Sequence, residues 1–173
     1  MRGILLLCAS AAVLALPAAA AARAHASSSP PGFLVVRDGK TDRGISGRPV
    51  ATVVVKGFVI GRIAVEGAVE VYRLSGVVAP QAAGPDITRS TVTYHGVPGI
   101  RFSGSGFRFR AVSGVWRVVV YGAGVSLYAG GEGRKVTLHG STAYPTKDGT
   151  YSLDGGRFVS LPAGSFRGRF GAK

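Results

Sequence analysis

Cysteine is almost absent from this sequence. Its single cysteine, Cys8, lies in an N-terminal apolar segment that has the layout of a cleavable signal. Removal of that segment would leave a mature chain with no cysteine, which excludes both a disulfide framework and thiol catalysis. The 147 residues that follow position 26 are still enough to bury a hydrophobic core without disulfide or metal staples.

Long apolar runs are confined to the same N-terminal segment. Arg2 precedes an apolar stretch from Ile4 to Ala22, and Ala24-His25-Ala26 places small residues three and one before a cleavage point. This is the layout of a secretory signal peptide over residues 1–26, so we expect a secreted or cell-envelope protein that begins at Ser27. An uncleaved anchor is the alternative, because 19 apolar residues approach the length of a membrane span.

Acidic residues are scarce. The sequence has 8 Asp and Glu against 21 Lys and Arg, a formal net charge of +13, and loss of Arg2 and Arg23 with the signal would leave +11. Such a charge favours an anionic partner, namely an anionic polysaccharide, a teichoic-type polymer or a phospholipid surface. Nucleic acid is not the partner that we expect in vivo. The alternative is compositional, because 16 Arg against 5 Lys is what GC-rich coding would produce.

Residues that favour helices are also scarce. After position 26 the chain has 6 Leu and no Met, against 22 Val and 26 Gly. Valine suits pleated strands, whereas Leu and Met are typical of helices, and no long stretch has apolar residues at i, i+3, i+4 and i+7. The sequence therefore predicts an all-β fold. We expect an antiparallel meander that closes into a sandwich or barrel, with a short β-solenoid as the alternative.

Short alternating segments between Gly, Pro and Asp predict the positions of the strands. The Pro-containing connection Ala79–Arg89 is expected to be a crossover or a functional loop, and Asp154-Gly155-Gly156 is typical of a hairpin turn. We expect residues 27–32 to be a flexible leader, 33–161 a single all-β domain and 162–173 a basic C-terminal tail. The expected strands are Phe33–Val36, Val50–Ile60, Arg62–Glu66, Val69–Leu74, Ser90–Tyr94, Ile100–Phe102, Phe107–Val112, Val115–Tyr121, Val125–Ala129, Arg134–His139, Thr150–Leu153 and Arg157–Ser160.

One segment of the chain repeats. Phe102–Ala111 matches Val120–Ala129 at every apolar position and at both glycines, with a period of 18 residues. Repetition at this spacing is compatible with stacked rungs of a solenoid. It is also compatible with a meander of similar hairpins, which is the interpretation that we prefer.

Residue patterns typical of catalysis are missing. After the signal segment the only histidines are His95 and His139, and there is no Gly-x-Ser-x-Gly elbow for a hydrolytic serine. The acidic residues are scattered, which argues against a metal site, and Gly130–Lys135 lacks the ending of a phosphate-binding loop. We therefore expect no catalytic residues, metal ligands or cofactor. A hydrolase with a site near the 79–89 loop is the alternative.

Basic and aromatic side chains alternate with the core residues of the later strands. In Phe107–Val112, the two phenylalanines point to one side and the two arginines to the other. If these strands are sequential neighbours in the sheet, their outward residues form one basic, aromatic-containing surface. Arginine pairs well with phosphate or carboxylate, and tyrosine stacks on sugar or base rings. The predicted binding residues are Arg108, Arg110, Arg117, Tyr121, Tyr128 and Lys135.

The stretch from Ile100 to Gly140 resembles small secreted Gly/Val-rich all-β proteins of GC-rich bacteria and, more distantly, adhesins whose repeats read Gly-x-Gly between alternating strands. The resemblance implies no catalytic residues. The sequence therefore predicts a secreted, non-enzymatic binding or structural module that contacts an anionic cell-envelope polymer. A self-associating envelope protein is a further alternative.

Overall fold

The computed structural model describes residues 32–41, 47–141 and 148–171. The expected signal peptide, its cleavage point and most of the expected leader lie outside these residues. The described chain consists mainly of strands and contains no helix, so the all-β prediction is confirmed. None of it forms a helix that could cross a membrane. The strands are β1 (Gly32–Lys40), β2 (Ala51–Ser75), β3 (Gln81–Ala83), β4 (Asp86–Tyr94), β5 (Val97–Leu138), β6 (Thr150–Leu153), β7 (Val159–Ser160) and β8 (Phe166–Phe170).

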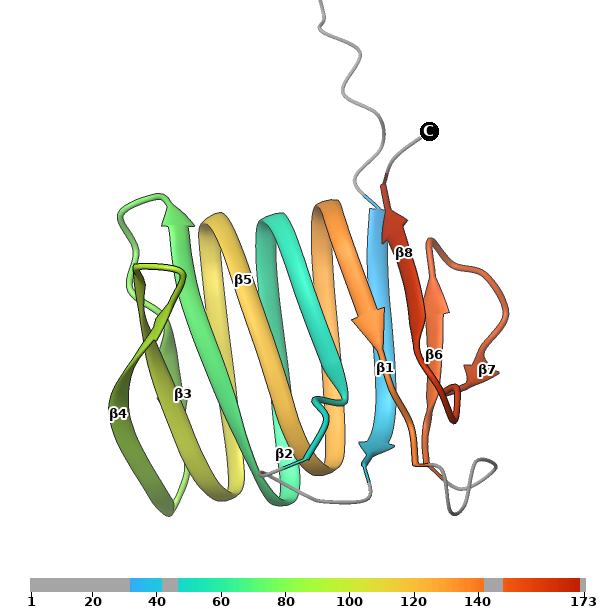
Figure 1. Ribbon diagram of the computed structural model, residues 1–173, viewed down its shortest axis with the longest axis horizontal. Helices are drawn as coiled ribbons and strands as arrows, with labels where there is room; N and C mark the ends of the chain where they lie inside the picture. The colour runs from blue at the N-terminus through green and yellow to red at the C-terminus, as the bar shows by residue number, and fades with distance from the viewer. Residues whose placement is uncertain (1–31, 42–46, 142–147, 172–173) are drawn as a thin grey trace, which may run out of the picture.

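Two long strands, β2 and β5, form a coiled antiparallel ribbon (Figure 1). Most residues of β2 pair with β5 on both sides, and the two partners stand 17 or 18 residues apart in the chain. Val59, for example, lies between Ala111 and Ala129. The 18-residue repeat of the sequence is therefore one turn of this ribbon, and its matching residues flank the same residue of β2.

The coiled ribbon produces two packed layers, which the chain joins at the upper and lower edges of Figure 1. The first, here the β4/β8 layer, runs in the order β4, β5 (97–104), β2 (67–75), β5 (115–121), β2 (51–56), β5 (132–138), β8. The second, here the β3/β7 layer, runs in the order β3, β5 (107–111), β2 (59–63), β5 (125–129), β1, β6, β7. This two-layer antiparallel arrangement agrees with the predicted sandwich, and the hydrogen-bonded path through the strands does not close on itself.

Glycines occupy the corners where β5 passes from one layer to the other. Gly104 and Gly122 adopt φ values of 152° and 122°, a region that side chains with a Cβ rarely enter. A Cβ at either position would also collide with the backbone carbonyl oxygen of Asp86 or Glu66 on the neighbouring strand. These corners allow adjacent segments of β5 to point their apolar side chains into the same core from opposite layers.

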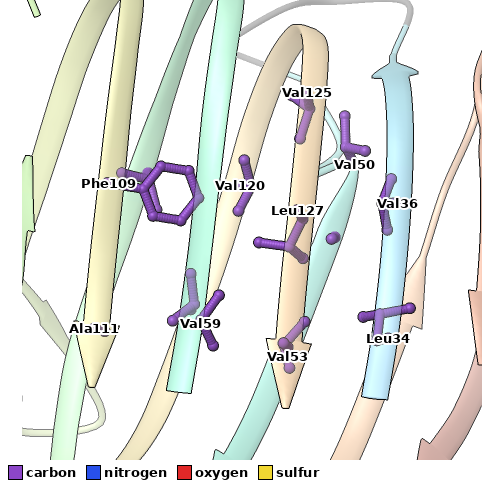
Figure 2. Close-up of a cluster of buried hydrophobic side chains, with 14 of the residues drawn as sticks. Leu34, Val36, Val50, Val53, Val59, Phe109, Ala111, Val120, Val125 and Leu127 are labelled. Atoms are coloured by element: carbon purple, nitrogen blue, oxygen red, sulfur yellow. The ribbon is translucent and has the colours of Figure 1, made fainter. Parts of the chain in front are cut away.

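The core lies between the two layers. Figure 2 shows side chains of β1, β2 and β5 directed into this space, among them Leu34, Val53 and Phe109. Trp116 and Phe107 are the largest side chains that are fully buried, and valines fill most of the rest. The β-branched residues fit a pleated surface, which explains why a chain so poor in leucine still forms a continuous core.

Three regions differ from the expected arrangement. The segments of β5 are not sequential neighbours, because a segment of β2 lies between each consecutive pair in the same layer. The expected 79–89 loop contains β3 and the start of β4, which cap one end of the sandwich. The expected tail 162–173 contains β8, whose Phe170 is buried. The predicted Thr150–Ser160 hairpin is confirmed by the pairing of β6 with β7.

Candidate anion-binding groove

A groove of about 850 Å³ crosses the outer surface of the β3/β7 layer. It runs over β3, β5, β2, β5 and β1, at right angles to the strands. Two small side chains, Ala83 and Ser126, leave space on this surface between longer ones. Gly61 and Ala82 are directed toward the core instead. Ile60 and Tyr128, which are 40% and 38% exposed, supply apolar surface to the groove.

Among the described residues that line this groove, four are arginines and one is a carboxylate. The arginines are Arg37, Arg62, Arg108 and Arg110, and the carboxylate is Asp38, which gives a formal balance of +3. Arg62 and Arg108 are directly opposite each other on neighbouring strands. Like charges in this position destabilise a sheet. Within the described residues the two ion pairs are Arg101–Glu70 and Arg134–Glu132, so neither neutralises the groove.

Two of the groove arginines are held by neighbouring side chains. Arg110 donates hydrogen bonds from both Nε and a terminal nitrogen to Oε1 of Gln81 on β3, the first over 2.8 Å. The guanidinium of Arg37 lies 4.1 Å from the centre of the Phe158 ring. Because Gln81 is neutral and Phe158 apolar, both contacts orient a cation without cancelling its charge.

An aromatic cluster adjoins the arginines on the same outer surface. Tyr128 contacts Phe33 and Phe58, with ring centres 6.1 Å and 5.4 Å apart. Both phenylalanines lie opposite Gly130, where a side chain would occupy the space taken by the Phe58 ring. The groove therefore combines planar cations with ring surfaces, which is the chemistry that binds an anion carried on a sugar or another ring.

The structure divides the six predicted binding residues between the two layers. Arg108, Arg110 and Tyr128 lie together in the groove. The other three, Arg117, Tyr121 and Lys135, lie on the outer surface of the β4/β8 layer. The prediction of one shared surface was wrong because consecutive segments of β5 alternate between the layers.

The outer surface of the β4/β8 layer carries a compact polar cluster. Glu70 accepts hydrogen bonds from Arg101 over 2.9 Å and from the Tyr72 hydroxyl over 2.8 Å. Burial, reinforced by the hydrogen bond to Glu70, raises the pKa of Tyr72 far above its ordinary value. Burial also raises the pKa of Tyr121, which lies beneath the Arg101 guanidinium. Both tyrosines therefore stay neutral over the physiological pH range.

Several residues in and beside the groove were not predicted from the sequence as binding residues. Alternation within β2 places Ile60 and Arg62 on the outside, but it does not reveal that Arg62 faces Arg108. Gln81 lies in the segment that was expected to be a functional loop, and it does reach the groove. No sequence pattern indicates that Phe33 and Phe58 lie near Tyr128, because this proximity depends on pairing between distant parts of the chain.

Within the described part of the chain, no three His, Asp or Glu side chains lie close enough together to hold a metal ion. Comparison of the chain with known protein families, with curated proteins and with solved structures gave no match.

Proposed function

We propose that this protein is an exported, non-enzymatic module that binds an anionic polysaccharide in the groove of the β3/β7 layer. The observation that carries the proposal is the direct opposition of Arg62 and Arg108, beside Arg110 and in a groove with one carboxylate. An arrangement that costs folding stability is expected to persist where it serves binding. Export rests on the signal-like sequence of residues 1–26.

The shape of the groove supports a linear polymer as the ligand. Arg108 and Arg62 stand on adjacent strands, Ser126 follows on the next, and Arg37 lies on the strand after that. Neighbouring strands are about 4.8 Å apart, so these cations form a row that crosses the sheet. A chain with regularly spaced carboxylates, lying along this row, would meet successive guanidinium groups.

The aromatic cluster favours a polysaccharide over the other two anionic partners. The exposed ring of Tyr128 provides a flat apolar surface beside the cations, against which a sugar ring can pack. A teichoic-type phosphate polymer or a phospholipid surface would use the arginines but gain less from the rings. Binding of those partners is therefore expected to be weaker and to depend less on Tyr128.

The proposal can be tested with polygalacturonate as the probe and two double variants of equal charge change. R108E/R110E reverses two groove charges at positions i and i+2 of a strand. R167E/R169E does the same on β8, where both arginines are exposed on the opposite layer. Each charge-assisted hydrogen bond contributes about 1.5 kcal/mol or more, so the groove variant should bind about 100-fold more weakly.

The β8 variant serves as the control for net charge. It should retain affinity within a few-fold of the wild type, and wild-type binding should weaken steeply with added salt, as expected for contacts between opposite charges. Equal losses from both variants would show that overall charge, rather than the groove, attracts the polymer. Unchanged affinity of R108E/R110E would refute the proposed site.

A further inference from the structure

Arg117 stands on the outside of the β4/β8 layer and forms no ion pair with any described residue. Its guanidinium lies 3.8 Å from the centre of the Tyr94 ring, and its buried Nε has no hydrogen-bond partner within the described residues. A buried donor without an acceptor costs roughly 1–3 kcal/mol. The side chain is thus positioned and partly desolvated, but no carboxylate in the described part of the chain is paired with it.

The only carboxylate of the adjoining polar cluster is already engaged. Glu70 accepts from Arg101 through one oxygen and from Tyr72 through the other, and it forms no ion pair with Arg117 among those that the described residues make. A second cation stands nearby, because Val54 is flanked by Arg117 on one side and by the exposed Lys135 on the other. Arg117 and Lys135 therefore place two positive charges on either side of Val54.

We propose that Arg117 and Lys135 form a second anion site, which takes a carboxylate of the same polysaccharide, so that one molecule bridges two polymer chains. This inference rests on the proposed function of the groove, whose ligand chemistry it shares. The Tyr94 ring holds the guanidinium flat, and the terminal nitrogens of Arg117 with the ammonium of Lys135 are the donors for the carboxylate.

The placement of the two sites makes bridging the expected outcome. The groove lies on the outer surface of one layer, and Arg117 lies on the outer surface of the other, with the hydrophobic core between them. A short oligosaccharide bound in the groove cannot reach through the core to Arg117. Two chains held on opposite surfaces would become linked, and this linkage would raise the avidity of a polymer network without any new contact.

Calorimetric titration with trigalacturonate, which is too short to span both surfaces, measures the number of sites directly. The wild type is expected to bind two molecules per chain, whereas R117Q and the groove variant R62Q/R108Q should each bind one. R167Q, which removes an exposed arginine from the same layer as Arg117, is the matched control and should bind two. Because R117Q removes a stacked side chain, K135Q provides a variant at an exposed position, and it should weaken the second site several-fold.

The outcomes separate this inference from the proposed function. A wild-type stoichiometry of one, lost in R62Q/R108Q and unaffected by R117Q and K135Q, would overturn the second site and leave the groove intact. Loss of binding in R117Q alone, with full binding in R62Q/R108Q, would refute the groove instead and would also overturn bridging. Long polygalacturonate should form turbid networks with the wild type and none with R117Q. The urea midpoint of R117Q checks that this variant is folded.

Discussion

Removing the charge of Arg62 is expected to make the protein more stable. Arg62 and Arg108 are paired residues on neighbouring strands, and both are exposed. Two unit charges roughly 6 Å apart in water repel by about 0.7 kcal/mol, and physiological salt reduces this by about half. R62Q should therefore raise the free energy of unfolding by about 0.3 kcal/mol in 0.15 M salt and by more at low ionic strength.

Urea denaturation of R62Q, R108Q and R62Q/R108Q at two salt concentrations provides the assay. Either single substitution relieves the same repulsion, so the double variant should gain little beyond a single one, and this non-additivity identifies the pair. The gain should disappear at about 1 M salt, where the screening length is only about 3 Å. R167Q is the control, because Arg167 lies opposite Thr137. Additive destabilisation by the two groove substitutions would refute the reasoning.

Three further predictions concern the fold. In urea denaturation, G122A should lower the free energy of unfolding by about 1–3 kcal/mol, because the corner requires a positive φ and leaves no space for a Cβ. The control G164A, at an open position, should change the free energy of unfolding by less than about 1 kcal/mol. Stability should fall as the pH rises above about 10, because burial raises the pKa values of Tyr72, Tyr121 and Tyr151 and the unfolded chain therefore ionises before the folded one. Urea midpoints measured from pH 8 to 11 test this, and a flat profile would contradict it. R89V should make the protein associate, as seen by size-exclusion chromatography. Arg89 lies on the outermost strand of its layer, opposite the core residue Phe102, and an inward-pointing charge on such a strand deters pairing with another chain. A monomeric R89V variant would contradict this role.

Local alternation predicted which side chains of β5 face the core. Phe107 and Phe109 are buried while Arg108 and Arg110 are exposed, as the two-residue period of a strand requires. The turn at Asp154 and Gly155 was also predicted, and both residues have the positive φ values that a tight hairpin turn needs. These features depend only on neighbours in the chain.

The pairing of the strands could not be predicted in the same way. The repeat of 18 residues was visible, but its meaning depends on β2, which lies far away in the sequence and separates the repeated segments. Arg62 faces Arg108 only because of the register in which β2 pairs with β5, and this register shifts by one residue at the corners of the ribbon. The division of the six predicted binding residues between two layers follows from the same long-range pairing.

The arginine side-chain NMR signals of the protein, recorded while trigalacturonate is added, test the central claim most directly. The claim is that a defined groove, rather than the overall positive charge, binds the polymer. Signals of Arg37, Arg62, Arg108 and Arg110 should shift with saturation, whereas those of Arg167 and Arg169 should stay unchanged. Small, unsaturated shifts of equal size at all arginines would contradict the claim.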